Sequence, residues 1–201
     1  MPGENLAMAE LYDPATSLWL ECPDMSQPRE GHSATLLEDG RVLVVGMDSN
    51  NWMAGSAEIY EPALNAWLPT GVPLASHYFH RASLLLNGKV LVSGGSNNPL
   101  VSSEIFDPAS GLWRAAATLN TERDDHAATV LDSGQVLLTG GRTLGSLATA
   151  TVEVSEQTDT VVMASNLGTS GSPGNASPTE GVGAGPGGAP TLDVNSFLGA
   201  A

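Results

Sequence analysis

One short stretch recurs three times along the chain and constrains its fold more than any other feature. Its copies cover residues 31–46 (GHSATLLEDGRVLVVG), 80–95 and 126–141. Each copy contains two apolar segments joined by a pair that ends in glycine, such as Asp39-Gly40. Asp-Gly or Asn-Gly between β-formers predicts a β-hairpin with a type I′ turn, which needs positive φ at both central residues. Hairpins at a fixed period indicate a repeat protein.

A second unit recurs between the hairpins. Residues 9–19 read AELYDPATSLW, and related sequences occupy 57–67 and 103–113. Each unit predicts a short strand ending in an aromatic residue, an acid-Pro turn, and a second strand near a tryptophan. Proline fixes φ for a turn and cannot continue a strand, so we expect the chain to reverse there.

The two units alternate along the chain at nearly constant spacings. The glutamates at 10, 58, 104 and 153 are 48, 46 and 49 residues apart, and the tryptophans at 19, 67 and 113 are 48 and 46 apart. The histidines at 32, 80 and 126 have these same two spacings. One period therefore contains four strands, called A to D from the hairpin onward. Such a period is typical of a β-propeller blade.

The pattern resembles the kelch repeat, and its residue sequence is similar to that of bacterial-type kelch repeats. The resemblance covers residues 8–154 and rests on the apolar strand B, a diglycine, and an aromatic residue followed after six residues by tryptophan. The diglycine is present as Gly94-Gly95 and Gly140-Gly141, while the first copy has Gly46-Met47. The resemblance implies an all-β propeller in which strand A lines a central channel and strand D lies outermost.

The predicted organisation is an incomplete propeller followed by a tail. The propeller segment covers 1–154, and its last C strand has Ser155 where the aromatic residue is expected. Residues 157–201 are rich in Gly, Pro and Ser, a composition typical of a flexible tail. The segment divides into a half blade (8–25), two blades (29–74 and 75–120) and a partial blade (121–156).

About three blade-equivalents are fewer than the usual minimum of four in a closed ring. A start at strand C also leaves open sheet edges. Two explanations stay open. The chain could be a piece of a longer protein, which is our expectation, or copies could self-associate through the unpaired blade edges and build a six-bladed ring.

The charge balance limits the classes of partner. There are 22 acidic and 7 basic residues, a net charge of −15. Nucleic acids and anionic membranes need basic patches, so we expect neither as a partner. The acidity would suit a basic partner or a divalent cation, or it could serve solubility alone. Cys22 is the single cysteine, which excludes an intrachain disulfide. No signal peptide is recognisable at the N-terminus, and no apolar run is long enough to span a bilayer.

The periodic histidines suggest two roles. His32, His80 and His126 occupy one equivalent position at the entry to strand A, and three imidazoles can bind zinc or copper if their nitrogens converge. A residue that repeats in every blade is more simply part of a repeated hydrogen-bond network, here with Arg29, His77 or Arg123 three residues earlier. We therefore predict neither a metal site nor a cofactor.

An enzyme of the galactose oxidase or glyoxal oxidase type is the alternative function. The resemblance implies this alternative because these enzymes use a kelch-like propeller, with copper held by tyrosines and histidines and one Tyr cross-linked to Cys. Here Tyr12 and Tyr60 belong to the repeat pattern, Cys22 lies at the end of an outer strand, and Tyr78 beside His77 is not periodic. A full copper site cannot be assembled from these residues. Other catalytic motifs are absent from the sequence, so we do not expect an enzyme.

The favoured function is non-catalytic binding of a protein or carbohydrate through variable loops. Loops that vary on a repeating scaffold are where binding specificity usually lies. The connections between strands B and C differ among the copies, and Trp52 is the one tryptophan outside the periodic set. The candidate binding residues are Asn50, Asn51, Trp52, Met53, Asn97, Asn98 and Arg142.

Overall fold

The structure is a computed structural model, and it describes residues 7–48, 51–95, 103–143, 147–155 and 163–164. For residues 48, 51–54 and 163–164 only the backbone is described. The chain divides into two units, residues 1–169 and 170–201. All the described residues belong to the first unit, and the second lies outside them.

The described residues form strands and turns. The strands are β1 (Glu10–Asp13), β2 (Leu18–Glu21), β3 (Arg29–Leu36), β4 (Val42–Asp48), β5 (Asn51–Glu61), β6 (Ala66–Pro69), β7 (Arg81–Leu84), β8 (Val90–Ser93), β9 (Ser103–Asp107), β10 (Leu112–Ala115), β11 (Ala127–Val130), β12 (Val136–Thr139), β13 (Arg142–Thr143), β14 (Leu147–Ala148), β15 (Val152–Ser155) and β16 (Met163–Ala164). Within this part of the chain no helix is long and apolar enough to cross a membrane.

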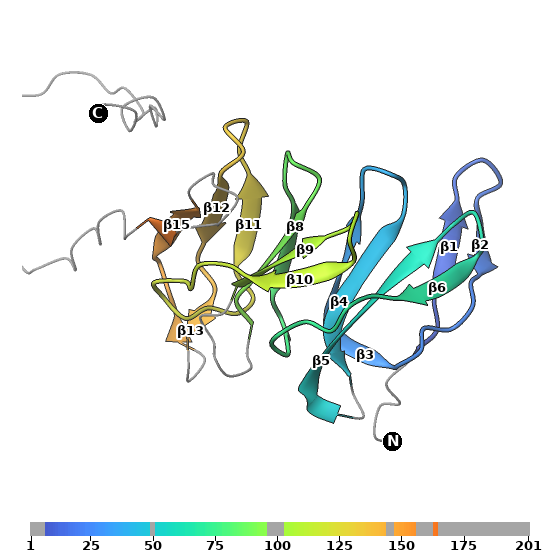
Figure 1. The fold of residues 1–201 in the computed structure, drawn as a ribbon, viewed down its shortest axis with the longest axis horizontal. Helices are drawn as coiled ribbons and strands as arrows, with labels where there is room; N and C mark the ends of the chain where they lie inside the picture. Colours follow the sequence, from blue (N-terminus) through green and yellow to red (C-terminus); the bar gives the residue numbers. More distant parts are fainter. Residues whose placement is uncertain (1–6, 49–50, 96–102, 144–146, 156–162, 165–201) are drawn as a thin grey trace, which may run out of the picture. The chain divides into compact units, whose positions relative to one another are not determined.

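The strands form three four-stranded antiparallel sheets and two isolated hairpins. The sheet orders are β3-β4-β5-β6, β7-β8-β9-β10 and β11-β12-β15-β16, here named blades I, II and III. The β1–β2 hairpin is a half blade, made of strands C and D. Strand β7 contacts both β3 and β11, so the A strands of consecutive blades lie together at the inner side (Figure 1). The predicted all-β fold of incomplete propeller blades is confirmed.

The B strands are buried because they carry almost unbroken apolar sequence. In β8, Val90, Leu91 and Val92 are each 0% exposed. A strand in the middle of a sheet that has another blade on both faces has no solvent side, so alternation between polar and apolar residues is lost. The prediction that strand B is buried on both faces is confirmed for β4 and β8, whereas β12 alternates between buried and half-buried residues.

The hairpin turns between strands A and B differ from the predicted type I′ turns. Gly40 has a φ of 87°, but Asp39 is not among the residues with positive φ. Gly40 N donates to Leu37 O, and Leu37 N donates to Arg41 O. This is a type I turn followed by a left-handed glycine, the usual three-residue hairpin loop. The prediction of a hairpin was right and that of the turn type was wrong, since the glycine lies one position later in the loop than a type I′ turn requires.

The periodic aromatic residues fill the space between neighbouring blades, as predicted, where a preceding blade is present. Phe106 and Trp113 of blade II, at 0% and 9% exposure, pack against the apolar side chains of blade I. Fully burying one such side chain contributes about 1.5–3 kcal/mol. The Trp113 indole also lies 3.4 Å from Thr70 Oγ1, and the equivalent Trp67 donates to Pro23 O at 2.7 Å. The aromatic pair of blade I thus contacts the half blade and that of blade II contacts blade I, whereas blade III has Ser155 in place of the aromatic residue.

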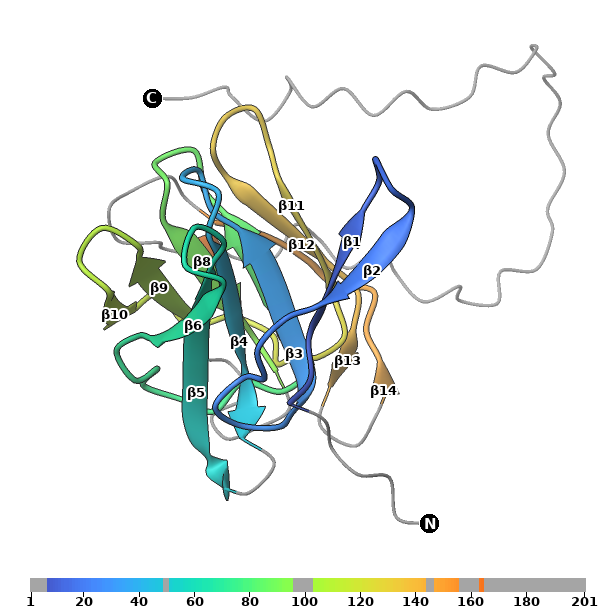
Figure 2. The same cartoon turned by 90° about the vertical axis from the view of Figure 1, so that its right-hand side faces the viewer.

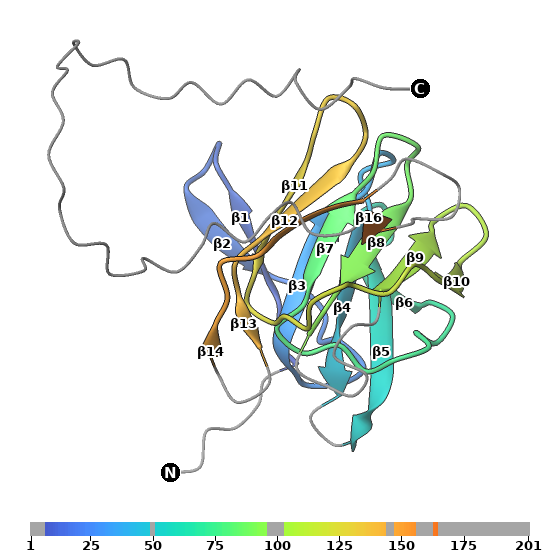
Figure 3. The same ribbon diagram turned by 90° about the vertical axis from the view of Figure 1, so that its left-hand side faces the viewer.

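The two ends of the row of blades differ. Figure 2 views the row from the half blade β1–β2, and Figure 3 views it from blade III. In the half blade, Tyr12 and Trp19 are 46% and 64% exposed. In blade III, β16 pairs with β15, so the sheet reaches two residues into the segment whose composition predicts a tail.

Candidate functional site

The inner rim of the blades is formed by the residue that precedes each periodic histidine. Gly31, Phe79 and Asp125 occupy this position, and their φ angles are 57°, 56° and 52°. Phe79 N donates to Gly31 O at 3.1 Å, and Asp125 N donates to Phe79 O at 2.9 Å. One backbone conformation thus links three successive blades by a chain of hydrogen bonds.

Two of these three positions hold side chains that the backbone conformation disfavours. A left-handed φ costs a residue other than glycine about 1–2 kcal/mol. Gly31 requires glycine, because a Cβ there would collide with the ring of Tyr78. For the bulky Phe79 this conformation is an outlier, whereas aspartate, as at Asp125, is among the residues that adopt it more readily. Strain of this kind is concentrated at functional sites, so the side chains at the rim are candidates for function.

Charged groups from two blades meet at Asp125. Its Oδ1 lies 3.3 Å from Arg81 Nη2 and its Oδ2 lies 3.0 Å from Arg142 Nη2. The side chains of the two arginines are each 41% exposed and that of Asp125 is 46% exposed. Arg142 Nε also pairs with Asp124 Oδ1 at 3.1 Å. At this exposure the pairs contribute little to stability, about 0–1 kcal/mol each. They hold two guanidinium groups in fixed positions facing solvent.

Two aromatic rings complete the rim. The rings of Tyr78 and Phe79 have centroids 4.0 Å apart, and the Arg142 guanidinium carbon lies 5.7 Å from the Phe79 centroid. Tyr78 Oη donates to Glu30 Oε1 at 3.0 Å. Burial, and then the hydrogen bond to the Glu30 carboxylate, raise the pKa of Tyr78 above its usual value. The phenol therefore stays neutral and serves as a hydrogen-bond donor.

Of the predicted binding residues, the structure places the side chain of Arg142 at this rim. Asn50, Asn97 and Asn98 lie outside the described residues. Asn51, Trp52 and Met53 belong to β5, where only the backbone is described. Asn51 pairs with Asp48 of β4 beyond a register shift, and Asp48 also pairs with Arg29, so this segment lies at the end of blade I where β3 begins. The binding role of all seven residues stays a prediction.

The periodic histidines form hydrogen bonds between blades. His80 Nε2 lies 2.7 Å from Ser33 Oγ of blade I, and His126 Nε2 lies 3.1 Å from Ser93 Oγ of blade II. Both rings are 1% exposed, and their Nδ1 atoms have no hydrogen-bond partner among the described residues. Burial lowers the pKa of His80 well below its usual value, and burial together with Arg123 lowers the pKa of His126 to about 4. Both rings are neutral at pH 7.

The residues three positions before these histidines make a different contact, which the sequence analysis did not foresee. Arg29 pairs with Glu58, His77 with Glu104, and Arg123 with Glu153, at 2.6, 2.9 and 2.6 Å. Each cation also bonds to the carbonyl of a glycine at the end of strand B. We call these three ion pairs the blade clamps.

The blade clamps also hold the segment that leads into each blade. Both oxygens of Glu104 accept backbone N–H groups, from Leu74 and Ala75 at 2.7 Å, and Glu153 accepts those of Asn120 and Thr121. Buried charges persist only when they are paired and hydrogen-bonded in this way. The signal in the sequence was the common period of the glutamates and the cations. That period marked the repeat without showing that the two side chains meet.

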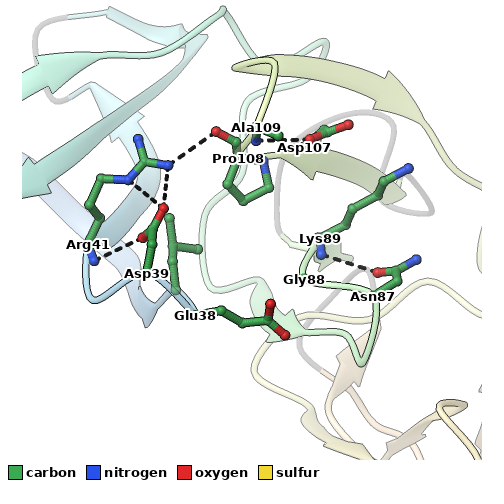
Figure 4. Close-up of a pocket in the computed structure, with 10 residues that line it drawn as sticks. Glu38, Asp39, Arg41, Asn87, Gly88, Lys89, Asp107, Pro108 and Ala109 are labelled. Atoms are coloured by element: carbon green, nitrogen blue, oxygen red, sulfur yellow. Dashed lines mark hydrogen bonds and ion pairs between the residues drawn. The ribbon is translucent and has the colours of Figure 1, made fainter.

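A separate cavity of about 420 Å³ lies at the opposite end of the blades (Figure 4). It is lined by Leu37, Glu38, Asp39, Arg41, Asn87, Gly88, Lys89, Asp107, Pro108 and Ala109. Its polar groups already stabilise turns, as when Asp39 Oδ1 accepts Arg41 N and Asn87 Oδ1 accepts Lys89 N. Arg41 spans to Pro108 O at 3.2 Å.

Comparison with known proteins identifies the repeat. Residues 78–120, which include blade II, match the kelch motif, so the resemblance seen in the sequence is confirmed. No curated protein matches the chain.

Two solved structures show the same fold at 16% sequence identity. The structure of YjhT matches 78% of this chain with a TM-score of 0.59, and the chain spans 56% of that protein. A fungal alcohol oxidase of the AA5 family, in complex with copper, matches 64% of this chain with a TM-score of 0.52, and the chain spans 28% of that protein. At this identity the likeness concerns the fold alone.

Proposed function

We propose that this chain is a non-catalytic binding module whose ligand surface is the rim where β3, β7 and β11 begin. The observation that supports this most directly is the left-handed backbone at Phe79 and Asp125. In blade I the equivalent residue is glycine, so the scaffold does not need a side chain there. Phe79 and Asp125 keep the strained conformation, and their aromatic ring and carboxylate lie at the rim.

The chemistry of the rim suits a polar ligand with planar or hydroxylated groups. Arg81 and Arg142 present guanidinium groups, Asp125 presents a carboxylate, and Phe79 and Tyr78 offer ring surface. Guanidinium groups and aromatic rings are the residues that dominate the energy of protein interfaces. We infer that a peptide segment or a carbohydrate binds at this rim, together with the loop that contains Trp52.

The experiment has two stages, selection of a ligand and titration of variants. The purified chain would be screened against an oligosaccharide array and a displayed peptide library, and the best ligand titrated by calorimetry. We expect Phe79→Ala, Arg142→Ala and Trp52→Ala each to weaken binding at least about tenfold, the usual effect of removing an interface anchor. The matched controls are Arg41→Ala and Leu86→Ala at the opposite end of the blades. A ligand whose affinity is unchanged in all three rim variants would exclude this surface.

A copper oxidase is the alternative function, suggested by the fold shared with the fungal alcohol oxidase. The described residues do not fit a copper centre. No group of three or more His, Cys, Asp or Glu side chains in this part of the chain is arranged to hold a metal ion. Both ring nitrogens of His77 are engaged, by Gly94 O and Glu104, and the Tyr78 hydroxyl is bonded to Glu30. Stoichiometric copper in the purified protein, with radical absorption, would contradict the binding function.

A further inference from the structure

The three blade clamps define what a C strand requires from its own blade. In blades I, II and III the glutamate of strand C is paired with a cation that comes just before strand A. All three glutamates are at most 4% exposed. Each also accepts at least one backbone N–H from the segment that leads into the blade. A C strand that carries this glutamate therefore fits beside a hairpin of strands A and B whose entry holds an Arg or a His.

The half blade has the glutamate without the cation. Glu10 of β1 is equivalent to Glu58 and Glu104, but it is exposed and has no ion-pair partner among the described residues. It lies directly opposite Glu21 across the β1–β2 hairpin. Like charges at opposed positions destabilise a β-hairpin. A cation at Glu10 would relieve this repulsion.

The half blade also has an open edge and an open face. Among the described strands, β1 pairs with β2 alone, whereas the other long C strands pair on both sides. Tyr12 and Trp19 are 46% and 64% exposed, while the equivalent Phe106 and Trp113 of blade II are 0% and 9% exposed. Among the described residues, β1 has no B strand beside it, and no preceding blade covers Tyr12 and Trp19.

Blade III has the complementary defect. Its C strand, β15, pairs with β12 over three residue pairs, compared with four between β8 and β9. Ser155 replaces the aromatic residue, and Val136 N bonds to its hydroxyl. The fourth strand, β16, has two residues. The A and B strands of blade III pair regularly and follow Arg123. The inner half of this blade therefore resembles that of the other blades, whereas its outer strands β15 and β16 form fewer pairs.

We propose that the β1–β2 hairpin of one molecule replaces β15 and β16 in blade III of a second molecule. Residue equivalence fixes the pairing. Glu58 opposes Val44 and Glu104 opposes Val92, so Glu10 would oppose Leu138 and Leu11 would oppose Leu137. Arg123 would then pair with Glu10 in place of Glu153. Tyr12 and Trp19 would pack against the apolar face of blade II that contains Leu91 and Ile105.

The exchange is reciprocal, which selects a second copy as the partner. The half blade and blade III lie at opposite ends of the described row of blades (Figure 1), so the described part of one molecule does not bring them together. Two molecules that exchange half blades form two joint blades, and with two copies of blades I and II the ring has six. Six is within the usual range for closed propellers.

The first experiment measures the mass of the full-length chain in solution by light scattering over a range of concentrations. We expect a dimer. Glu10→Gln should raise the dimer dissociation constant at least about tenfold, because it removes one partner of a buried ion pair. Glu21→Gln is the matched control, with the same change on the other strand of the hairpin, and should leave the constant within about twofold. A monomer at all concentrations, or a dimer equally stable in both variants, would overturn the proposal.

The second experiment tests the register by cross-linking. In a Cys22→Ser background, Leu11→Cys with Leu137→Cys should give an interchain disulfide on oxidation, since directly opposed residues of antiparallel strands are close enough for one. Leu11→Cys with Leu86→Cys is the control, because Leu86 is 62% exposed in a hairpin turn far from β1. Equal cross-linking in the two double variants would overturn the proposed register. Neither experiment uses the rim, so its outcome is independent of the proposed binding function.

Discussion

At the inner rim, one backbone position accepts glycine, phenylalanine or aspartate, and the three residues meet different neighbours. Gly31 faces the Tyr78 ring, so any Cβ would collide with it. Phe79 and Asp125 have similar left-handed φ angles, 56° and 52°, and carry side chains. A side chain at any of the three positions has the cost of a left-handed φ. A side chain at position 31 has in addition the cost of the collision with Tyr78.

This difference predicts the effect of alanine at two glycines. Gly31→Ala should destabilise the protein by about 3 kcal/mol, from the left-handed φ and the displaced Tyr78 ring. Gly40→Ala should cost only about 1–2 kcal/mol, because its φ is also positive but no atom lies within 4 Å of the added carbon. Urea unfolding of the two variants measures both values. Equal losses would show that the ring of Tyr78 moves aside freely.

The buried histidines predict a loss of stability in mild acid. The pKa of His126 is about 4 in the folded protein, below its ordinary value of 6.5. Between these two values the unfolded chain binds the proton and the folded chain does not. Stability is therefore complete above pH 6.5 and falls as the pH drops toward 4, by roughly 3 kcal/mol from this residue.

The measurement is urea unfolding at several pH values between 7 and 4. His126→Gln keeps a hydrogen-bonding group near Ser93 but does not titrate, so the slope of unfolding free energy against pH should be smaller in this variant. His32→Gln is the comparison variant. Partial burial and the nearby Arg29 also lower the pKa of His32, but this residue is more exposed than His126 and should contribute less to the slope. Identical slopes in the wild type and His126→Gln would contradict the burial of an uncharged ring.

At the scale of the strand and the blade, the clamps explain why strand C begins near a glutamate. The two nitrogens of His77 face Gly94 O and the Glu104 carboxylate. The His77 ring thus occupies the place that the guanidinium groups of Arg29 and Arg123 have in the other blades. The geometry of this contact is what repeats, and the residue type can vary.

A matched pair of variants tests the clamp. Glu104→Gln should destabilise the protein by about 3–5 kcal/mol, because it leaves His77 and two backbone N–H groups facing a neutral amide in a buried site. Glu10→Gln makes the same change at the equivalent position of the half blade. There the side chain is exposed and has no ion-pair partner within the described part of the chain, so monomer stability should change by less than about 0.5 kcal/mol. Thermal unfolding at low protein concentration compares the two. Similar small effects would mean that the clamp is not a stabilising interaction.

The elements were largely predictable from the sequence, and the contacts between them were not. Three copies of one pattern determined the strands, their order and the buried B strands, because periodicity reports burial directly. The turn type was missed, since a glycine position alone does not define the φ of the residue before it. The rim was missed for a similar reason, because nothing in the sequence distinguishes a left-handed Phe79 or Asp125 from an extended one. From the sequence, the clamp glutamates could be recognised only as residues that recur at a nearly fixed spacing.

For the whole molecule, the row of blades predicts a gradient of local stability. In a repeat protein each unit is stabilised mainly by its neighbours. Blade II has a blade on both sides, and Phe106, Val90 and Leu91 are fully buried within it. The half blade has one neighbour, and its large apolar side chains are 46–64% exposed. Amide hydrogen exchange should therefore be slowest in β8 and fastest in β1 and β2.

Protein concentration changes this gradient if half blades are exchanged between molecules. Dilution should leave protection in β8 unchanged, because its neighbours belong to its own chain. Protection in β1 should rise with concentration, as its free N–H groups pair with β12 of a second molecule, and Glu10→Gln should abolish the rise. Exchange followed by mass spectrometry at two concentrations, one on each side of the dimer dissociation constant, measures both strands in one sample. A rise spread evenly over all blades would indicate nonspecific association, whereas a rise confined to β1, β2 and their new neighbours identifies the exchanged half blade.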